Sequence, residues 1–95
     1  MLFLVESHNT GDITPYLEAE TARIGELHRD GIVETVLLKA DHSGAFILVR
    51  TAELASAHDA IESLPIAANG LTSVEFTEVI AIDSIPGVSV PQPAS

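Results

Sequence analysis

Ala45-Phe46-Ile47-Leu48-Val49 is the stretch that decides the fold, because its five consecutive apolar residues leave no side for water. A strand with one solvated face alternates apolar and polar residues, since successive side chains point to opposite faces of the sheet. The same unbroken apolarity marks three other strand segments, Leu2–Val5, Val36–Leu38 and Val79–Ile82. These strands are therefore expected to be covered on both faces.

Turn and helix signals before this stretch predict three elements. A strand at Leu2–His8 ends in a cluster of turn residues. Thr14 is typical of a helix N-cap, Pro15 of a first helical position and Gly31 of a helix end. Ile32–Leu38 then reads as a strand, which residues 40–44 join to the central stretch as a hairpin loop.

Three further features complete the chain. Thr51 is expected to cap a second helix that Pro65 stops, and Val74–Ile82 is expected to form the last strand. The order strand, helix, strand, strand, helix, strand predicts the ferredoxin-like α+β fold, a four-stranded antiparallel sheet with two helices on one face. This domain spans residues 1–83, and residues 84–95 form an extended, proline-containing tail.

The second face of the sheet has no predicted cover of its own. Two helices cover one face, so the other would expose more apolar surface than a monomer usually tolerates. With 95 residues and no cysteine, the chain has no disulfide to compensate for a small core. We therefore expect a second copy to pack against this face as a dimeric α+β barrel, with Val88–Val90 able to tie dimers into a larger homo-oligomer.

Charge and motif content exclude several classes of function. Fourteen acidic against four basic residues give a net charge of −10, which disfavours nucleic acid and anionic membranes as partners. No apolar run reaches the length of a membrane span, and with no cysteine or export signal we expect a cytoplasmic protein. The histidines are far apart and no glycine-rich phosphate loop is present, so no metal and no cofactor is expected.

Three short motifs then point to a known family. They are Met1-Leu2-Phe3-x-Val5, Leu27-x-Arg29-Asp30-Gly31 and His58-Asp59-x-Ile61-x-x-Leu64-Pro65. Over residues 1–80 the chain resembles the muconolactone isomerase family of dimeric α+β barrel proteins. It departs from the family pattern at residues 33–38, where the family carries tryptophan, histidine and arginine, and at residues 66–70, where the family has an aromatic, proline-containing segment.

The resemblance implies an isomerase-like protein that transfers a proton next to the carbonyl of a small organic acid or lactone, without a cofactor. Such a step needs a base, an acid and a donor to the enolate oxygen. The departures keep a second hypothesis open, a non-catalytic small-molecule-binding or assembly module of the same fold. A third is a cofactor-free monooxygenase, which calls for an aromatic-lined pocket.

Three residues are candidate proton carriers. Glu34 interrupts an apolar strand, where a carboxylate is costly unless it is functional or paired, and both interpretations stay open. His8 ends the first strand and is either a catalytic acid or a solvated strand end. His42 lies in the hairpin loop, where function and simple chain reversal are both common.

Three more charged residues are candidate ligands for an anionic or lactone substrate. Lys39 and Arg50 flank the hairpin strands and either bind an anion or form cross-strand ion pairs. Glu75, on the last strand, is the third candidate ligand. By contrast, Glu18 and Glu20 are expected only to favour the positive end of the first helix.

Overall fold

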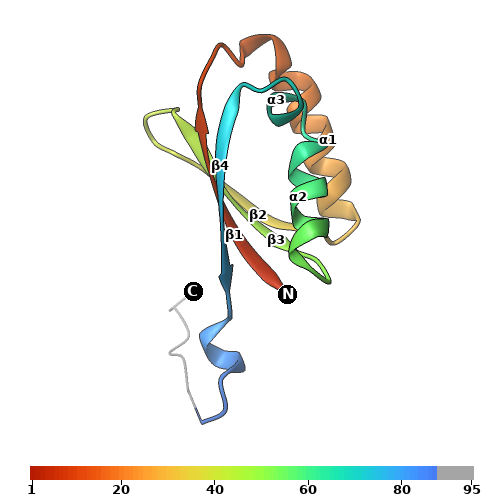
Figure 1. Ribbon diagram of the computed structural model, residues 1–95, viewed down its shortest axis with the longest axis vertical. Coiled ribbons are helices and arrows are strands. Elements are labelled where there is room, and N and C mark those ends of the chain that lie inside the picture. The colour runs from red at the N-terminus through yellow and green to blue at the C-terminus, as the bar shows by residue number, and fades with distance from the viewer. Residues whose placement is uncertain (88–95) are drawn as a thin grey trace, which may run out of the picture.

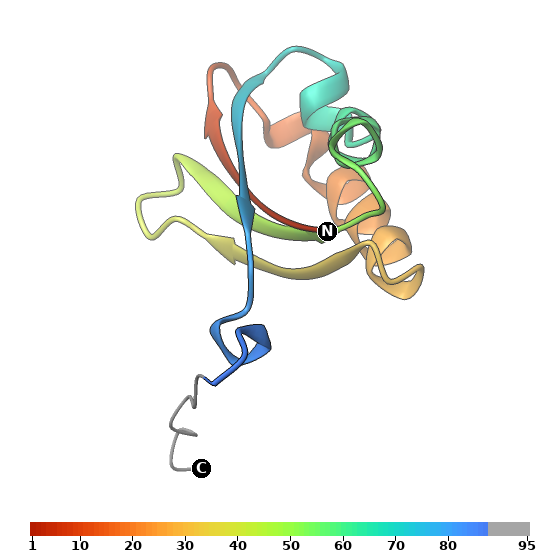
Figure 2. The same ribbon diagram turned by 60° about the horizontal axis from the view of Figure 1, so that its bottom comes forward.

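The computed structural model describes residues 1–87 as a curved sheet with helices against one face (Figures 1 and 2). The predicted tail crosses the limit of the described residues, and the segment Val88–Val90 lies outside them. The elements follow in the order β1 (Leu2–Asn9), η1 (Thr14–Tyr16), α1 (Leu17–Arg29), β2 (Val33–Leu38), β3 (Gly44–Arg50), α2 (Leu54–Glu62), α3 (Pro65–Ala68), β4 (Thr72–Val79) and η2 (Ile82–Ser84).

The four strands form one antiparallel sheet in the order β2-β3-β1-β4. The first strand is therefore central: Leu4 pairs with Leu48 of β3 on one side and with Thr77 of β4 on the other. This arrangement confirms the predicted ferredoxin-like α+β fold, with the helices on one face only. Within residues 1–87, no helix is both long enough and apolar enough to cross a bilayer.

The helix face of the sheet carries the core. Phe3 and Val5 of β1 pack with Val49 of β3 against Leu27 of α1 and Ile61 of α2, and each is at most 2% exposed. Burial of large side chains is the main stabilising contribution in a domain of this size, about 1.5–3 kcal/mol for each. The core thus fixes α1 and α2 on the sheet.

The opposite face of the sheet, here called the outer face, has no helix against it. Leu4 of β1 is 36% exposed there and Leu37 of β2 is 62% exposed. The pairing register places on the outer face the following residues: Leu2, Leu4, Glu6, His8, Thr35, Leu37, Phe46, Leu48, Arg50, Ser73, Glu75, Thr77 and Val79. The apolar stretches Leu2–Val5 and Ala45–Val49 of the central strands thus present side chains to both faces, whereas the outer-face residues of β4 are mostly polar: Ser73, Glu75 and Thr77.

The start of the first helix differs from the prediction. Thr14 does not cap α1; Thr14–Tyr16 forms a 3₁₀ turn and α1 begins at Leu17. Asp12 Oδ1 accepts the backbone N–H of Thr14 at 3.0 Å and closes a turn directly before this segment. This hydrogen bond with Thr14 also lowers the pKa of Asp12.

The second helix is shorter than predicted and is followed by another. Thr51 donates its hydroxyl to the Glu53 carbonyl at 2.8 Å instead of capping, and α2 begins at Leu54. α2 ends at Glu62, before Pro65. Pro65 then begins α3, because the fixed φ of proline suits a first helical position. The last strand is likewise shifted toward the N-terminus, at Thr72–Val79.

Candidate functional site

A cavity of about 450 Å³ lies between the helix face of the sheet, α1 and α3, a volume typical of small-molecule sites. Most of its lining is aliphatic and comes from every layer: Ile13, Leu17, Ile24, Val36, Leu38, Ala45, Ile47, Ile61, Leu64, Ile66, Ala67 and Val74. Its polar lining is small: Ser7, Asn9, Thr14, Glu20, Thr21, His42 and Thr72, with Gly44 adding backbone.

Glu20 is the carboxylate of this cavity. It lies one turn after Leu17 and one turn before Ile24, so α1 presents it on the same face as these apolar side chains. Its Oε1 accepts the backbone N–H of Ile66 at 3.0 Å, a donor that the break between α2 and α3 leaves without an intrahelical partner. Burial raises the pKa of Glu20, and the hydrogen bond from Ile66 opposes this in part. A carboxyl group with a raised pKa is suited to proton transfer near neutral pH.

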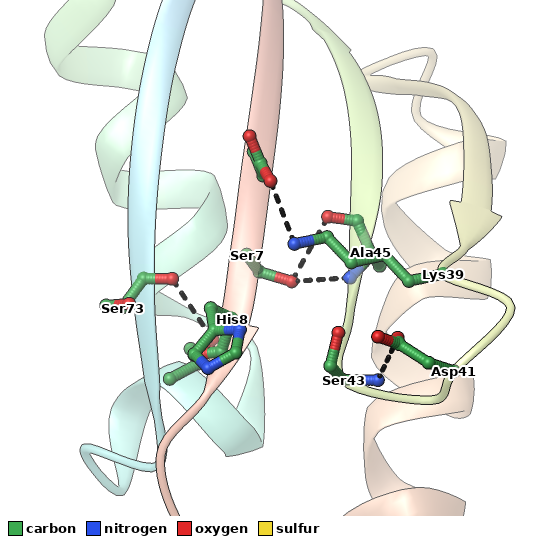
Figure 3. Close-up of polar contacts among 9 residues, drawn as sticks. Ser7, His8, Lys39, Asp41, Ser43, Ala45 and Ser73 are labelled. Atoms are coloured by element: carbon green, nitrogen blue, oxygen red, sulfur yellow. Dashed lines mark hydrogen bonds and ion pairs between the residues drawn. The ribbon is translucent and has the colours of Figure 1, made fainter.

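His42 reaches the cavity from the hairpin between β2 and β3. Its backbone has φ = 64°, a left-handed conformation uncommon for a residue with a side chain. Two hydrogen bonds fasten the hairpin to the end of β1: the Asn9 N–H donates to the Ser43 carbonyl at 2.7 Å, and the Asn9 amide donates to the His42 carbonyl at 3.4 Å. Asp41 Oδ1 accepts the Ser43 N–H inside the turn (Figure 3), and hydrogen bonds with Ser43 lower its pKa.

Gly44 allows this close approach. A Cβ at this position would lie 1.9 Å from the Ser7 carbonyl oxygen, so only glycine fits beside β1. The Ser7 hydroxyl in turn accepts the Ala45 N–H at 3.0 Å and donates to the Ala45 carbonyl at 3.3 Å (Figure 3). The hairpin that carries His42 is thus fixed to the central strand at several points.

A second concave region, here called the outer groove, lies on the outer face and measures about 470 Å³. Lys39 donates to Glu6 Oε2 at 2.8 Å and sits 5.4 Å from the centre of the Phe46 ring (Figure 3 shows Lys39 and His8 in front of the sheet). Glu75 pairs directly with Glu6 across β1 and β4. The full lining is Glu6, His8, Lys39, Ser73, Val74 and Glu75.

Glu34 and Arg50 lie apart from both regions. Their side chains form an ion pair, the second of the two interpretations that the sequence left open. The carboxylate of Glu34 raises the pKa of Arg50. Neither residue lines the cavity or the outer groove.

The structure therefore divides the candidate residues into three places. His8, Lys39 and Glu75 come together in the outer groove, His42 lies at the cavity, and Glu34 pairs with Arg50. Within residues 1–87, no cluster of three or more potential metal ligands is present.

Glu20 was not among the predicted site residues. A carboxylate near the start of a helix is stabilised by the positive end of the helix dipole, and this already explained a glutamate at position 20. The available signal was the spacing of Leu17, Glu20, Ile24 and Leu27, which places the carboxylate on the apolar stripe. His58, by contrast, does not lie on the apolar stripe of α2. It is exposed and stacks on Phe76 with ring centres 3.9 Å apart, while its neighbour Ala57 is fully buried.

Comparisons with known proteins give the fold. No model of a known protein family matches the chain, and no curated protein sequence matches it. Among solved structures, muconolactone isomerase is similar with a TM-score of 0.76 and 17% identity, over 97% of this chain and 98% of that one. The 5-chloro-2-hydroxyhydroquinone dehydrochlorinase of Burkholderia phenoliruptrix AC1100, in complex with 2,5-dihydroxybenzoquinone, is similar with a TM-score of 0.58 and 22% identity, over 79% of this chain and 91% of that one. The resemblance to muconolactone isomerase is thus confirmed for the fold.

Proposed function

From the fold shared with muconolactone isomerase, we propose that this protein is an isomerase-like enzyme that transfers a proton next to the carbonyl of a small lactone or organic acid. The observation that carries the proposal is Glu20, a carboxylate of raised pKa on the wall of an otherwise aliphatic cavity. Fold alone does not define an activity, so the residues of this cavity have to supply the chemistry.

The chemistry assigned to the cavity needs side chains only. The Glu20 carboxylate takes a proton from the carbon next to the carbonyl, and the electrons of that C–H bond move to give an enolate. His42, on the same cavity, donates a hydrogen bond to the enolate oxygen. In a substrate whose enolate is conjugated with a C=C bond, the protonated Glu20 then returns the proton to the remote carbon of that system, which shifts the double bond and restores the carboxylate.

The aliphatic lining adds to this chemistry. Water that leaves the cavity when substrate binds no longer screens the carboxylate or solvates the enolate. The same lining argues against the monooxygenase alternative, because no phenylalanine, tyrosine or tryptophan is among the described residues that line the cavity. The non-catalytic alternative keeps the cavity but needs no proton transfer.

Deuterium exchange separates these alternatives. Muconolactone is incubated with the protein in heavy water, and deuterium uptake is followed by NMR. We expect uptake with the wild type and a loss of at least about 100-fold in Glu20→Gln, since general acid–base groups contribute about 10²–10⁴. Glu18→Gln is the matched control, because Glu18 is exposed on the same helix and does not line the cavity. Binding without uptake by the wild type would favour the non-catalytic module.

We also propose that a second copy of the chain covers the outer face. Support comes from the exposed Leu4 and Leu37 on a sheet face that no helix covers. Lys39 and Arg50 form ion pairs there with Glu6 and Glu34, so Glu75 is the carboxylate of this face that adds to its negative charge. The lack of cysteine supports a cytoplasmic location.

Light scattering tests the second copy. Wild-type protein is expected to have at least twice the mass of one chain, and Leu37→Asp, which puts a charge on the outer face, is expected to reduce it to the monomer mass. Leu54→Asp is the control, because Leu54 is 44% exposed on α2, away from the outer face. A monomeric wild type at high concentration would refute this proposal.

A further inference from the structure

We infer that the cavity selects an uncharged substrate, a neutral lactone or ester, over a carboxylate of the same shape. The inference deepens the proposed function and rests on it, because it concerns the same cavity. The sequence predicted an anionic or lactone substrate, with Lys39 and Arg50 as candidate ligands, and of these two the inference keeps only the uncharged lactone.

The first support is the location of the cations. The chain has four lysines and arginines, all within the described residues, and none lines the cavity. Lys39 and Arg50 form ion pairs on the outer face. Arg23 contacts Glu26 at 3.7 Å and Ser63 at 3.1 Å, and Arg29 is exposed in the last turn of α1. No guanidinium or ammonium group of the chain is therefore placed to bind a substrate carboxylate.

The second support is the charge that the cavity does contain. Glu20 and His42 are the titratable side chains among its described lining residues. When Glu20 is ionised as the base, it repels a second carboxylate, and the aliphatic wall screens this repulsion poorly. A carboxylate also loses its hydration on entry, which costs free energy unless donors replace the water. An uncharged ester loses far less hydration free energy when it enters the cavity.

The third support is the direction of the hydroxyl groups. Four hydroxyls line the cavity, and three of them donate their protons to backbone carbonyls: Ser7 to Ala45, Thr21 to Leu17 and Thr72 to His8. A hydroxyl has one proton, so these three groups offer lone pairs and not protons to a ligand. Lone pairs disfavour an anion.

A matched pair of ligands tests the inference. Muconolactone carries one carboxylate, and its methyl ester has the same ring without the charge. Dissociation constants are measured at pH 8, where histidines are generally neutral, by NMR titration of the cavity residues. We expect the wild type to bind the ester at least about tenfold more tightly, a modest effect for two like charges in one cavity. Glu20→Gln is expected to reduce this preference to a few-fold, and Glu18→Gln is expected to leave it unchanged.

The outcomes distinguish this inference from the proposed function. Equal or tighter binding of the carboxylate overturns the inference, and so does an ester preference that Glu20→Gln leaves intact. Deuterium uptake measured on the same two ligands reports on the proton transfer separately. Uptake without an ester preference overturns the inference alone, whereas an ester preference without uptake overturns the proposed chemistry alone.

Discussion

Phe3 and Leu4 are neighbours in β1, yet Phe3 is 2% exposed on the helix face and Leu4 is 36% exposed on the outer face. The two faces also differ in charge. The outer face holds the Lys39–Glu6 and Arg50–Glu34 ion pairs, whereas the cavity on the helix face is lined by one carboxylate, Glu20. One sheet thus separates two environments: an outer face that holds both cations of the strands in ion pairs, and a cavity whose single carboxylate has no cation beside it.

Truncation of the two neighbours is the strongest way to break this comparison. Phe3→Ala is expected to lower the free energy of unfolding by about 3–5 kcal/mol, because it leaves a void in a closed core. Leu4→Ala is expected to cost less than about 1 kcal/mol in dilute protein, since its side chain is already partly in water. Urea unfolding at low concentration measures both. Similar losses would show that the outer face is as tightly packed as the core.

Gly44→Ala tests how firmly the hairpin is held between the faces. Its new methyl group would lie 1.9 Å from the Ser7 carbonyl oxygen, so the hairpin must move, at an expected cost of about 1–3 kcal/mol and with displaced His42 resonances. Gly70→Ala is the control, because a Cβ there meets nothing within 4 Å and only its positive φ is strained, at about 1 kcal/mol. A Gly44→Ala protein as stable as the wild type, with His42 unmoved, would contradict the close approach.

The pH dependence of stability sharpens the difference between the charges. Burial raises the pKa of Glu20, so the folded protein holds this proton more tightly than the unfolded chain. The contribution of Glu20 to the free energy of unfolding is therefore fully present below the ordinary pKa of a glutamate. It is lost as the pH rises through the raised pKa of the folded state. Glu20→Gln, which keeps an acceptor for Ile66, should gain stability relative to the wild type as the pH rises from acidic to neutral, by under about 1 kcal/mol because Glu20 is only partly buried. Thermal unfolding of both proteins at several pH values measures this difference in stability. If Glu20→Gln loses stability relative to the wild type as the pH rises, the pKa of Glu20 is lowered and not raised.

The smallest effect is expected at the Glu34–Arg50 ion pair. Exposed pairs are screened by solvent and salt, so Glu34→Gln should leave the unfolding midpoint unchanged at physiological ionic strength. It should also leave deuterium uptake unchanged, since neither residue lines the cavity. A loss of uptake in this variant would restore Glu34 as a proton carrier.

Much of the fold could be predicted because its signals are local. Continuous apolar strands, Gly31 and Pro65 define the element order without any knowledge of distant contacts. The boundaries that failed depend on competition between neighbouring groups. Asp12 takes the N–H of Thr14, and Pro65 both stops one helix and starts another.

The candidate site was harder to predict for a different reason. A cavity is made by residues far apart in sequence, and Glu20 meets Ile66 across 46 positions. Sequence position gives the face of a strand or helix but not which charges become partners. Glu34 stood out as a charge in an apolar strand, yet its partner Arg50 removes that conflict. Glu20 did not stand out because the helix start already accounted for it.

The central position of β1 has a consequence for how the chain folds. Its two neighbours, β3 and β4, begin at residues 44 and 72, so the first strand to be synthesised completes its pairing last. During translation β3 is the first partner available to β1, and the sheet is complete only after β4 has left the ribosome. Because such distant pairings slow folding, this small domain is expected to fold more slowly than a helical bundle of equal length.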